Sequence, residues 1–144
     1  NVSLKSKNTT FLTKVFTFCA ANQYGNKKWT DKENWDVFGK DTRVHGHNYT
    51  LHVTVTGDIN PDSGFLVDLG HLKKIVNEHV VDILDHSQFD KDIPWFKGKQ
   101  PSTEILVVFI WEEIVKHLEG CILHRIRIEE TPTIYTDYYG PTND

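Results

Sequence analysis

The stretch that decides the fold is His45-Gly-His-Asn-Tyr-Thr-Leu-His-Val-Thr-Val-Thr56. From Tyr49 onward its apolar residues occupy every second position, which is typical of a half-buried β-strand. Residues two apart share a face of a strand, so His45 and His47 are expected to point the same way, with Gly46 leaving space between them. Two imidazoles on one face form half of a zinc site. The alternative is a pair of strand histidines that hydrogen-bond to their neighbours.

Two helices are expected after this strand. Asp68 is placed to cap a helix whose apolar residues follow an i, i+3, i+4 spacing as far as Leu84. Ser102 is placed to cap a second helix that ends at Gly120. This helix is apolar on nearly all sides between Ile105 and Trp111. A four-stranded sheet and two helices leave little to cover it, which indicates burial against another subunit.

Further strands are expected over Val15–Ala20, Cys121–Glu130 and 133–138, and in the second of these Ile122, His124, Ile126, Ile128 and Glu130 share a face. The order of elements is therefore ββααββ. Strands and helices in separate runs favour an α+β fold, in which both helices cover one face of an antiparallel sheet.

Length and composition narrow the possible classes of protein. The 144 residues predict a single domain over 1–144, of which residues 1–10 are polar and expected to be loose. A net charge of −4, without basic clusters, argues against nucleic acid as a partner. No apolar run approaches the length of about 18 residues that a membrane span needs. Cys19 and Cys121 lie in apolar contexts and are interpreted as reduced core thiols of a cytoplasmic protein.

Several polar motifs occur in order between Phe16 and Tyr138. They are Phe18-Cys-Ala-Ala-Asn22, Phe38-Gly-Lys-Asp-Thr-Arg-Val-His-Gly-His-Asn-Tyr49, Asp85-His86, Ser102-Thr103-Glu104 and Glu130-Thr131. Together they resemble the 6-pyruvoyl-tetrahydropterin synthase family, which includes the 6-carboxytetrahydropterin synthases. The resemblance implies a T-fold (tunnelling fold), in which the sheets of three subunits close into a barrel and two trimers stack into a hexamer.

The resemblance also implies a zinc site of three histidines. His45 and His47 match two of them, but the third position is Asn22, whose neutral amide oxygen is a weaker ligand than imidazole. Three alternatives remain open at this point. Zinc binds weakly through two histidines and Asn22, another side chain such as His52 or His124 completes the set, or the site holds no metal.

Asp41 matches the position of the family's catalytic cysteine, where some members carry glutamate. Either a thiolate or a carboxylate can act as a general base, but a carboxylate is the weaker base unless burial raises its pKa. The alternative is a solvated loop acid. Asp85 and His86 match the pair that assists the base, since a carboxylate on an imidazole fixes its tautomer and raises its basicity. Such a pair at a helix end also serves as a cap.

Glu130 matches the residue that anchors the substrate, because one carboxylate can accept from both the 2-amino group and the N3–H of a pterin. Ser102, Thr103 and Glu104 match a segment that lines the pterin pocket from a neighbouring subunit, and Ser102 can be a helix cap as well. These matches imply a zinc-assisted lyase acting on the side chain of 7,8-dihydroneopterin triphosphate. Alternatives are side-chain cleavage to a 6-hydroxymethyl- or 6-carboxy-pterin, or a pterin-binding paralogue without catalysis.

Overall fold

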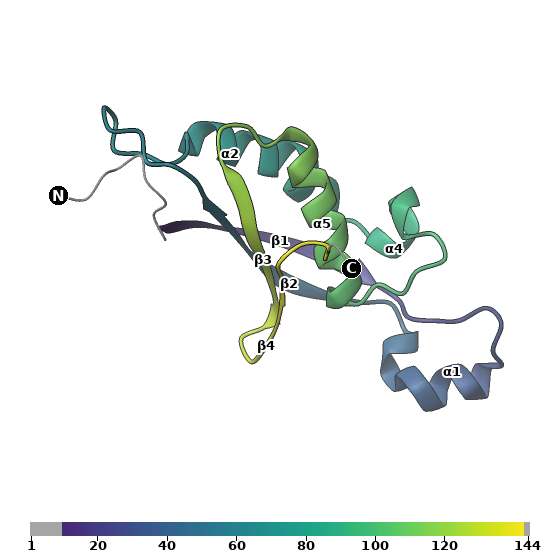
Figure 1. Ribbon diagram of the computed structural model, residues 1–144. Helices are drawn as coiled ribbons and strands as arrows, with labels where there is room; N and C mark the ends of the chain where they lie inside the picture. Colours follow the sequence, from purple (N-terminus) through teal and green to yellow (C-terminus); the bar gives the residue numbers. More distant parts are fainter. Residues whose placement is uncertain (1–9, 143–144) are drawn as a thin grey trace.

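A computed structural model describes residues 10–142, so the predicted loose segment lies outside the described residues except for Thr10. Four antiparallel strands form one sheet in the order β1-β2-β3-β4, and they cover Phe11–Asn22, His45–Thr56, Ile122–Thr131 and Ile134–Tyr138. The longer helices lie side by side over one face of this sheet (Figure 1). The predicted α+β fold with ββααββ order is therefore confirmed. A short helix, α1 (Asp31–Phe38), and a 3-10 turn, η1 (Gly39–Thr42), join β1 to β2 beyond one end of the sheet (Figure 1).

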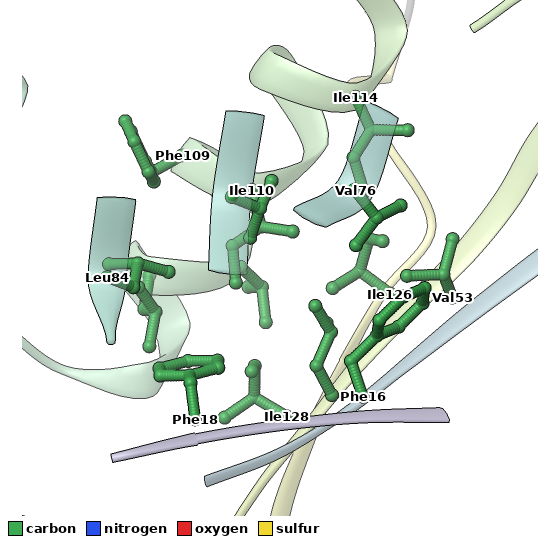
Figure 2. Close-up of a cluster of buried hydrophobic side chains, with 14 of the residues drawn as sticks. Phe16, Phe18, Val53, Val76, Leu84, Phe109, Ile110, Ile114, Ile126 and Ile128 are labelled. Atoms are coloured by element: carbon green, nitrogen blue, oxygen red, sulfur yellow. The ribbon is translucent and has the colours of Figure 1, made fainter. Parts of the chain in front are cut away.

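The alternation in β2 has the expected effect. Tyr49, Leu51, Val53 and Val55 are at most 1% exposed and face the helices. They meet alternate residues of β1, because the register places Phe18 opposite Tyr49 and Phe16 opposite Leu51. The core that results is built from both layers and includes Phe16, Phe18, Val53, Val76, Leu84, Phe109, Ile110, Ile114, Ile126 and Ile128 (Figure 2).

The first long helix begins where the sequence predicts. The Asp68 carboxylate accepts hydrogen bonds from the backbone N–H groups of Gly70 (2.9 Å) and His71 (3.3 Å), which would otherwise lack partners. From there α2 (Leu69–Val76) continues through a π-helical turn, η2 (Asn77–Val81), into α3 (Asp82–Leu84). The predicted apolar stripe is buried at Leu72, Val76, Val80 and Leu84.

Removing this cap should weaken the fold. Asp68→Ala leaves two N–H groups of α2 without their acceptor and is expected to lower the free energy of unfolding by about 1 kcal/mol, measured by urea denaturation. Asp62→Ala, in the exposed turn just before, is the control and should change stability little. Equal stabilities for the two variants would mean that Asp68 is dispensable as a cap.

The second long helix, α5 (Thr103–His117), is capped by the Ser102 hydroxyl, which accepts from the Ile105 N–H (3.2 Å). It ends three residues before the predicted Gly120. Leu106, Ile110 and Ile114 are fully buried in the core. On another side Phe109 packs on Trp95 and Phe96, with ring centroids 5.4 and 5.2 Å apart. The argument that α5 needs another subunit to cover it was therefore wrong, since the chain covers it with its own segment.

That covering segment lies between α3 and α5. It consists of α4 (Phe89–Asp92) and a 3-10 turn, η3 (Pro94–Phe96). Phe89 and Phe96 are at most 1% exposed, and their ring centroids lie 5.0 Å apart. The sequence of this region predicts only a loop, because a single helical turn is too short to show periodicity.

Two expectations about faces of the sheet were wrong. A β-bulge interrupts the β2–β3 register, so Leu123 pairs with Val55 and is buried, while Ile122 is 65% exposed. Ile122 therefore does not share the core face with Ile126. Cys19 is exposed, because the alternation of β1 turns its neighbours Phe18 and Ala20 inward. Cys121 is partly buried, and both thiols are free.

Within residues 10–142, no helix combines the length and apolar character needed to cross a membrane.

Candidate active site

The strands bring Asn22, His45 and His47 together at one end of the sheet. Asn22 is the register partner of His45, and Ala20 that of His47. The two imidazoles lie on the helix-covered face of β2 with ring centroids 5.3 Å apart and planes nearly perpendicular (89°). The predicted common orientation of the two histidines is confirmed. All three positions that the resemblance assigns to metal lie on adjacent strands, on the same face.

Asn22 is the most buried polar residue of this group, at 1% exposure. Its Nδ2 donates to the Tyr49 hydroxyl (3.0 Å), whereas its Oδ1 is buried without a hydrogen-bond partner among the described residues. A buried acceptor left unpaired costs about 1–3 kcal/mol. The oxygen is therefore suited to receive a metal ion or a donor group of a ligand.

Each imidazole has a carboxylate close to it. Asp41 Oδ1 lies 3.6 Å from His45 Nε2, and Glu130 Oε1 lies 3.2 Å from His47 Nε2. His45 Nδ1 is 2.9 Å from the backbone oxygen of Arg43. Since a carbonyl oxygen only accepts, this contact assigns the proton of the neutral ring to Nδ1 and leaves the Nε2 lone pair available to a metal. The Asp41 side chain is 60% exposed, so its carboxylate is largely solvated.

Glu130 lies where β3 departs from its register with β4, between Glu129 and Thr131. Its side chain is 24% exposed, and one carboxylate oxygen contacts His47. Glu130 also raises the pKa of Tyr49, although burial of that phenol is the larger cause. Tyr49 therefore stays protonated beside Asn22.

A second tyrosine, Tyr24, belongs to the site, although the sequence did not predict it. Its ring packs between Phe38 (centroids 5.3 Å apart) and His45 (6.5 Å, 11° between planes). Burial, followed by the charges of Glu130, Asp41 and Glu104, raises its pKa to about 12. Tyr24 lies in an aperiodic loop, where no sequence pattern singles it out. Tyr49 could have been found, because it shares the face of His47.

The start of α5 lies on the same side of the molecule. Thr103 Oγ1 donates to Glu104 Oε1 (3.0 Å) and is 2.8 Å from Thr136 Oγ1, which ties this carboxylate to β4. The charge of Glu104 acts on Tyr24 within one chain. Ser102 performs its capping role. A role of Ser102, Thr103 and Glu104 in binding substrate stays a prediction.

Asp85 and His86 form the expected pair, with His86 Nδ1 2.7 Å from Asp85 Oδ2. The Cys19 backbone N–H donates to Asp85 (2.8 Å), and this bond, followed by the one from His86, lowers the pKa of Asp85. The pair lies along the outer edge of β1, and no hydrogen bond or ion pair in the described chain connects it to Asp41 or the two imidazoles. His86 is 82% exposed and has a φ of 61°, in the left-handed region that residues other than glycine rarely adopt.

His52 and His124 do not complete the metal set. His52 lies on the opposite face of β2, with Nε2 3.1 Å from Glu129 Oε1. His124 packs against Phe11 at the other end of the sheet, with ring centroids 4.3 Å apart and planes tilted by 35°. Among residues 10–142, no group of three His, Cys, Asp or Glu side chains is close enough to hold an ion. A metal at this site would therefore need the Asn22 oxygen, and the residues fit a weak site of two imidazoles and one amide.

The fold and this site together define a T-fold protein with an enzyme-like cluster of imidazoles, carboxylates and phenols at one end of its sheet. Residues 11–141 match the family model described as 6-pyruvoyl tetrahydropterin synthase. The chain belongs to the 6-pyruvoyl tetrahydropterin synthase family.

Individual relatives agree with this assignment. The chain is 38% identical over 132 residues to the 6-pyruvoyl tetrahydrobiopterin synthase of Poecilia reticulata, covering 90% of each chain. It is 36% identical over 109 residues to the 6-carboxy-5,6,7,8-tetrahydropterin synthase of Bacillus subtilis, covering 69% of this chain and 70% of that one. The solved structure of the Caenorhabditis elegans 6-pyruvoyl tetrahydropterin synthase superposes with a TM-score of 0.86 at 33% identity, covering 92% of this chain and 96% of that one.

Proposed function

We propose that this protein is a metal-assisted lyase that converts 7,8-dihydroneopterin triphosphate to a 6-pyruvoyl tetrahydropterin. The observation that carries the proposal is the placement of Asn22, His45 and His47 on one face beside Glu130 and Asp41. The 38% identity to a protein named 6-pyruvoyl tetrahydrobiopterin synthase supports the proposal. The family match over residues 11–141 supports a single domain.

Each residue of the site is proposed to have the role that its side-chain chemistry allows. Glu130 accepts the two donors of the pterin edge, and Thr103 and Glu104, with the capping residue Ser102, border the pocket. Asp41, beside His45, accepts a proton from the substrate side chain. His45, His47 and the buried oxygen of Asn22 would hold the ion, for which zinc is proposed. When bound, the metal would polarise oxygens of the substrate side chain.

Asp85 and His86 enter this scheme only through assembly, because they lie at the outer edge of β1. We propose a homo-oligomer, a trimer or a hexamer, in which that edge meets another chain. Apolar side chains exposed on the strands support this proposal: Phe11, Val15, Ile122, Ile134 and Tyr135 are between 45% and 65% exposed. Closure into a barrel would also remove exposed sheet edges.

Light scattering of the purified protein should report a mass at least three times the 16.7 kDa of one chain. The chains are expected to associate because association buries the exposed apolar side chains between copies. A monodisperse monomer at micromolar concentration would contradict the assembly and leave Asp85 and His86 without a place in the site.

The identity of the product separates the alternatives. Mass spectrometry of the pterin formed from 7,8-dihydroneopterin triphosphate should find the 6-pyruvoyl compound. A 6-hydroxymethyl or 6-carboxy product would instead indicate side-chain cleavage, which the similarity to the Bacillus subtilis protein favours. Recovery of the bound substrate unchanged would indicate a pterin-binding protein without catalysis. The support for that alternative is the presence of Asn22 and Asp41 at two positions where the family's ligand and base are stronger.

A cytoplasmic location, consistent with two free thiols, is also proposed.

A further inference from the structure

The loop after β1 is held in place on both sides of Tyr24. Gln23 Nε2 donates to the Thr42 backbone oxygen (2.8 Å), and the Tyr24 N–H donates to that of Asp41 (2.9 Å). Gly25 exchanges two hydrogen bonds with the side chain of Gln100 (3.2 and 2.7 Å). Three successive residues are thus fixed to other elements, so the position of Tyr24 at the site is built into the fold.

The surroundings of the Tyr24 side chain differ at its two ends. Its ring packs against Phe38 and lies nearly parallel to the ring of His45. Its hydroxyl makes no hydrogen bond with any other residue of the described chain. Burial, followed by the negative charges of Glu130, Asp41 and Glu104, raises the pKa of this phenol, so the hydroxyl keeps its proton. Carboxylates only accept hydrogen bonds, so they can bind the O–H of a ligand hydroxyl but cannot donate to the lone pairs of its oxygen. The Tyr24 hydroxyl therefore supplies a hydrogen-bond donor beside carboxylates that can only accept.

Building on the proposed function, we propose that Tyr24 is a substrate-positioning residue. Its hydroxyl donates a hydrogen bond to an oxygen on the 6-side chain of the pterin. The ring edge of the pterin presents donors, which Glu130 accepts. The side chain at the opposite end presents hydroxyl groups, whose oxygen lone pairs accept hydrogen bonds. The nearly parallel packing of Tyr24 and His45 places the phenol at the imidazole end of the site. Tyr24 would thereby select pterins that carry an oxygen on this side chain.

Two pterins with the same ring test this selectivity. L-Biopterin carries hydroxyl groups on its side chain and 6-methylpterin carries none, so only the first can accept from Tyr24. Tyr24→Phe keeps the aromatic ring and removes the hydroxyl. We expect it to weaken binding of biopterin about fivefold to tenfold, as for loss of one hydrogen bond, and to leave binding of 6-methylpterin unchanged. Calorimetric titration of both ligands measures the ratio of the two affinities.

Tyr139→Phe, which changes an exposed tyrosine in edge-to-face contact with His124, is the matched control and should alter neither affinity. Equal weakening of both ligands by Tyr24→Phe would show that the residue only shapes the pocket, and no weakening of either would show that its hydroxyl is idle. Both results overturn the assignment of Tyr24 while pterin binding itself stands. A parent protein that binds neither pterin contradicts the proposed function and, with it, this inference.

Discussion

Asn22→His is expected to change the protein from one that loses its metal to one that retains about one zinc ion per chain after dialysis against a weak chelator. The substitution places a third imidazole opposite His45 in the register, on the face that His47 shares. Three neutral histidines form a complete protein set for a catalytic zinc, with the fourth position open to substrate. An amide oxygen in the third position is the weaker ligand. Elemental analysis before and after dialysis measures the difference.

His45→Ala should abolish metal binding in either background, which makes it the control for binding elsewhere on the chain. If the parent protein already retains one zinc per chain, Asn22 or another group serves as a full ligand and the account of a weakened site is wrong. Buried Asn22 contacts Tyr49, so the melting temperature of Asn22→His must be compared with that of the parent to separate metal binding from misfolding.

If Asn22→His retains zinc but shows no activity, the missing function is expected to be that of the general base, Asp41. Its side chain is largely solvated and 3.6 Å from His45. Asp41→Cys in the Asn22→His background places the thiol that the resemblance implies beside a complete metal set. Turnover of dihydroneopterin triphosphate should then exceed that of the parent. No turnover in this double variant would favour a pterin-binding protein without catalysis.

Glu130→Gln is expected to weaken binding of biopterin by more than tenfold. The carboxylate can accept from two pterin donors, whereas the amide has one acceptor oxygen and presents its own N–H groups to the ligand. Loss of a charged contact in a partly buried site costs roughly 2–4 kcal/mol. Fluorescence titration with biopterin measures the loss.

The neighbouring residue offers a closely matched control. Glu129 lies 3.1 Å from His52, much as Glu130 lies 3.2 Å from His47, but on the opposite face of the sheet. Glu129→Gln removes an equal charge one residue away and should leave biopterin binding unchanged. Similar losses in both variants would indicate a general electrostatic effect, and an unchanged affinity in Glu130→Gln would make Glu130 a structural residue of the strand.

Strong local patterns in the sequence predicted much of this fold. The alternation of β2, the capping residues Asp68 and Ser102, and the order of elements all depend on interactions within a few residues, and each was confirmed. The common face of His45 and His47 follows from the same alternation. Their approach to Asn22 is a pairing between strands, which the sequence reached only through a family resemblance.

The exposure of Cys19 follows from the local alternation of β1, but the other failures have a common physical cause, since each depends on contacts between segments distant in the sequence. The bulge that buries Leu123 is set by pairing with Val55. The cover over α5 comes from Phe89 and Phe96, which belong to short turns without a periodic pattern. Tyr24 enters the site because its loop is hydrogen-bonded to residues after Phe38 and to Gln100. The sequence around each of these residues shows no periodic pattern that would predict the contact.

The central claim is that the cluster around His45, His47 and Glu130 is a pterin-processing site. The most direct test is phosphorus NMR of 7,8-dihydroneopterin triphosphate incubated with the zinc-supplemented parent protein and, in parallel, with Glu130→Gln and Glu129→Gln. The account predicts release of inorganic triphosphate by the parent and by Glu129→Gln, and little or none by Glu130→Gln. Triphosphate release that is equal in all three proteins, or absent from all three although biopterin binds, would contradict it.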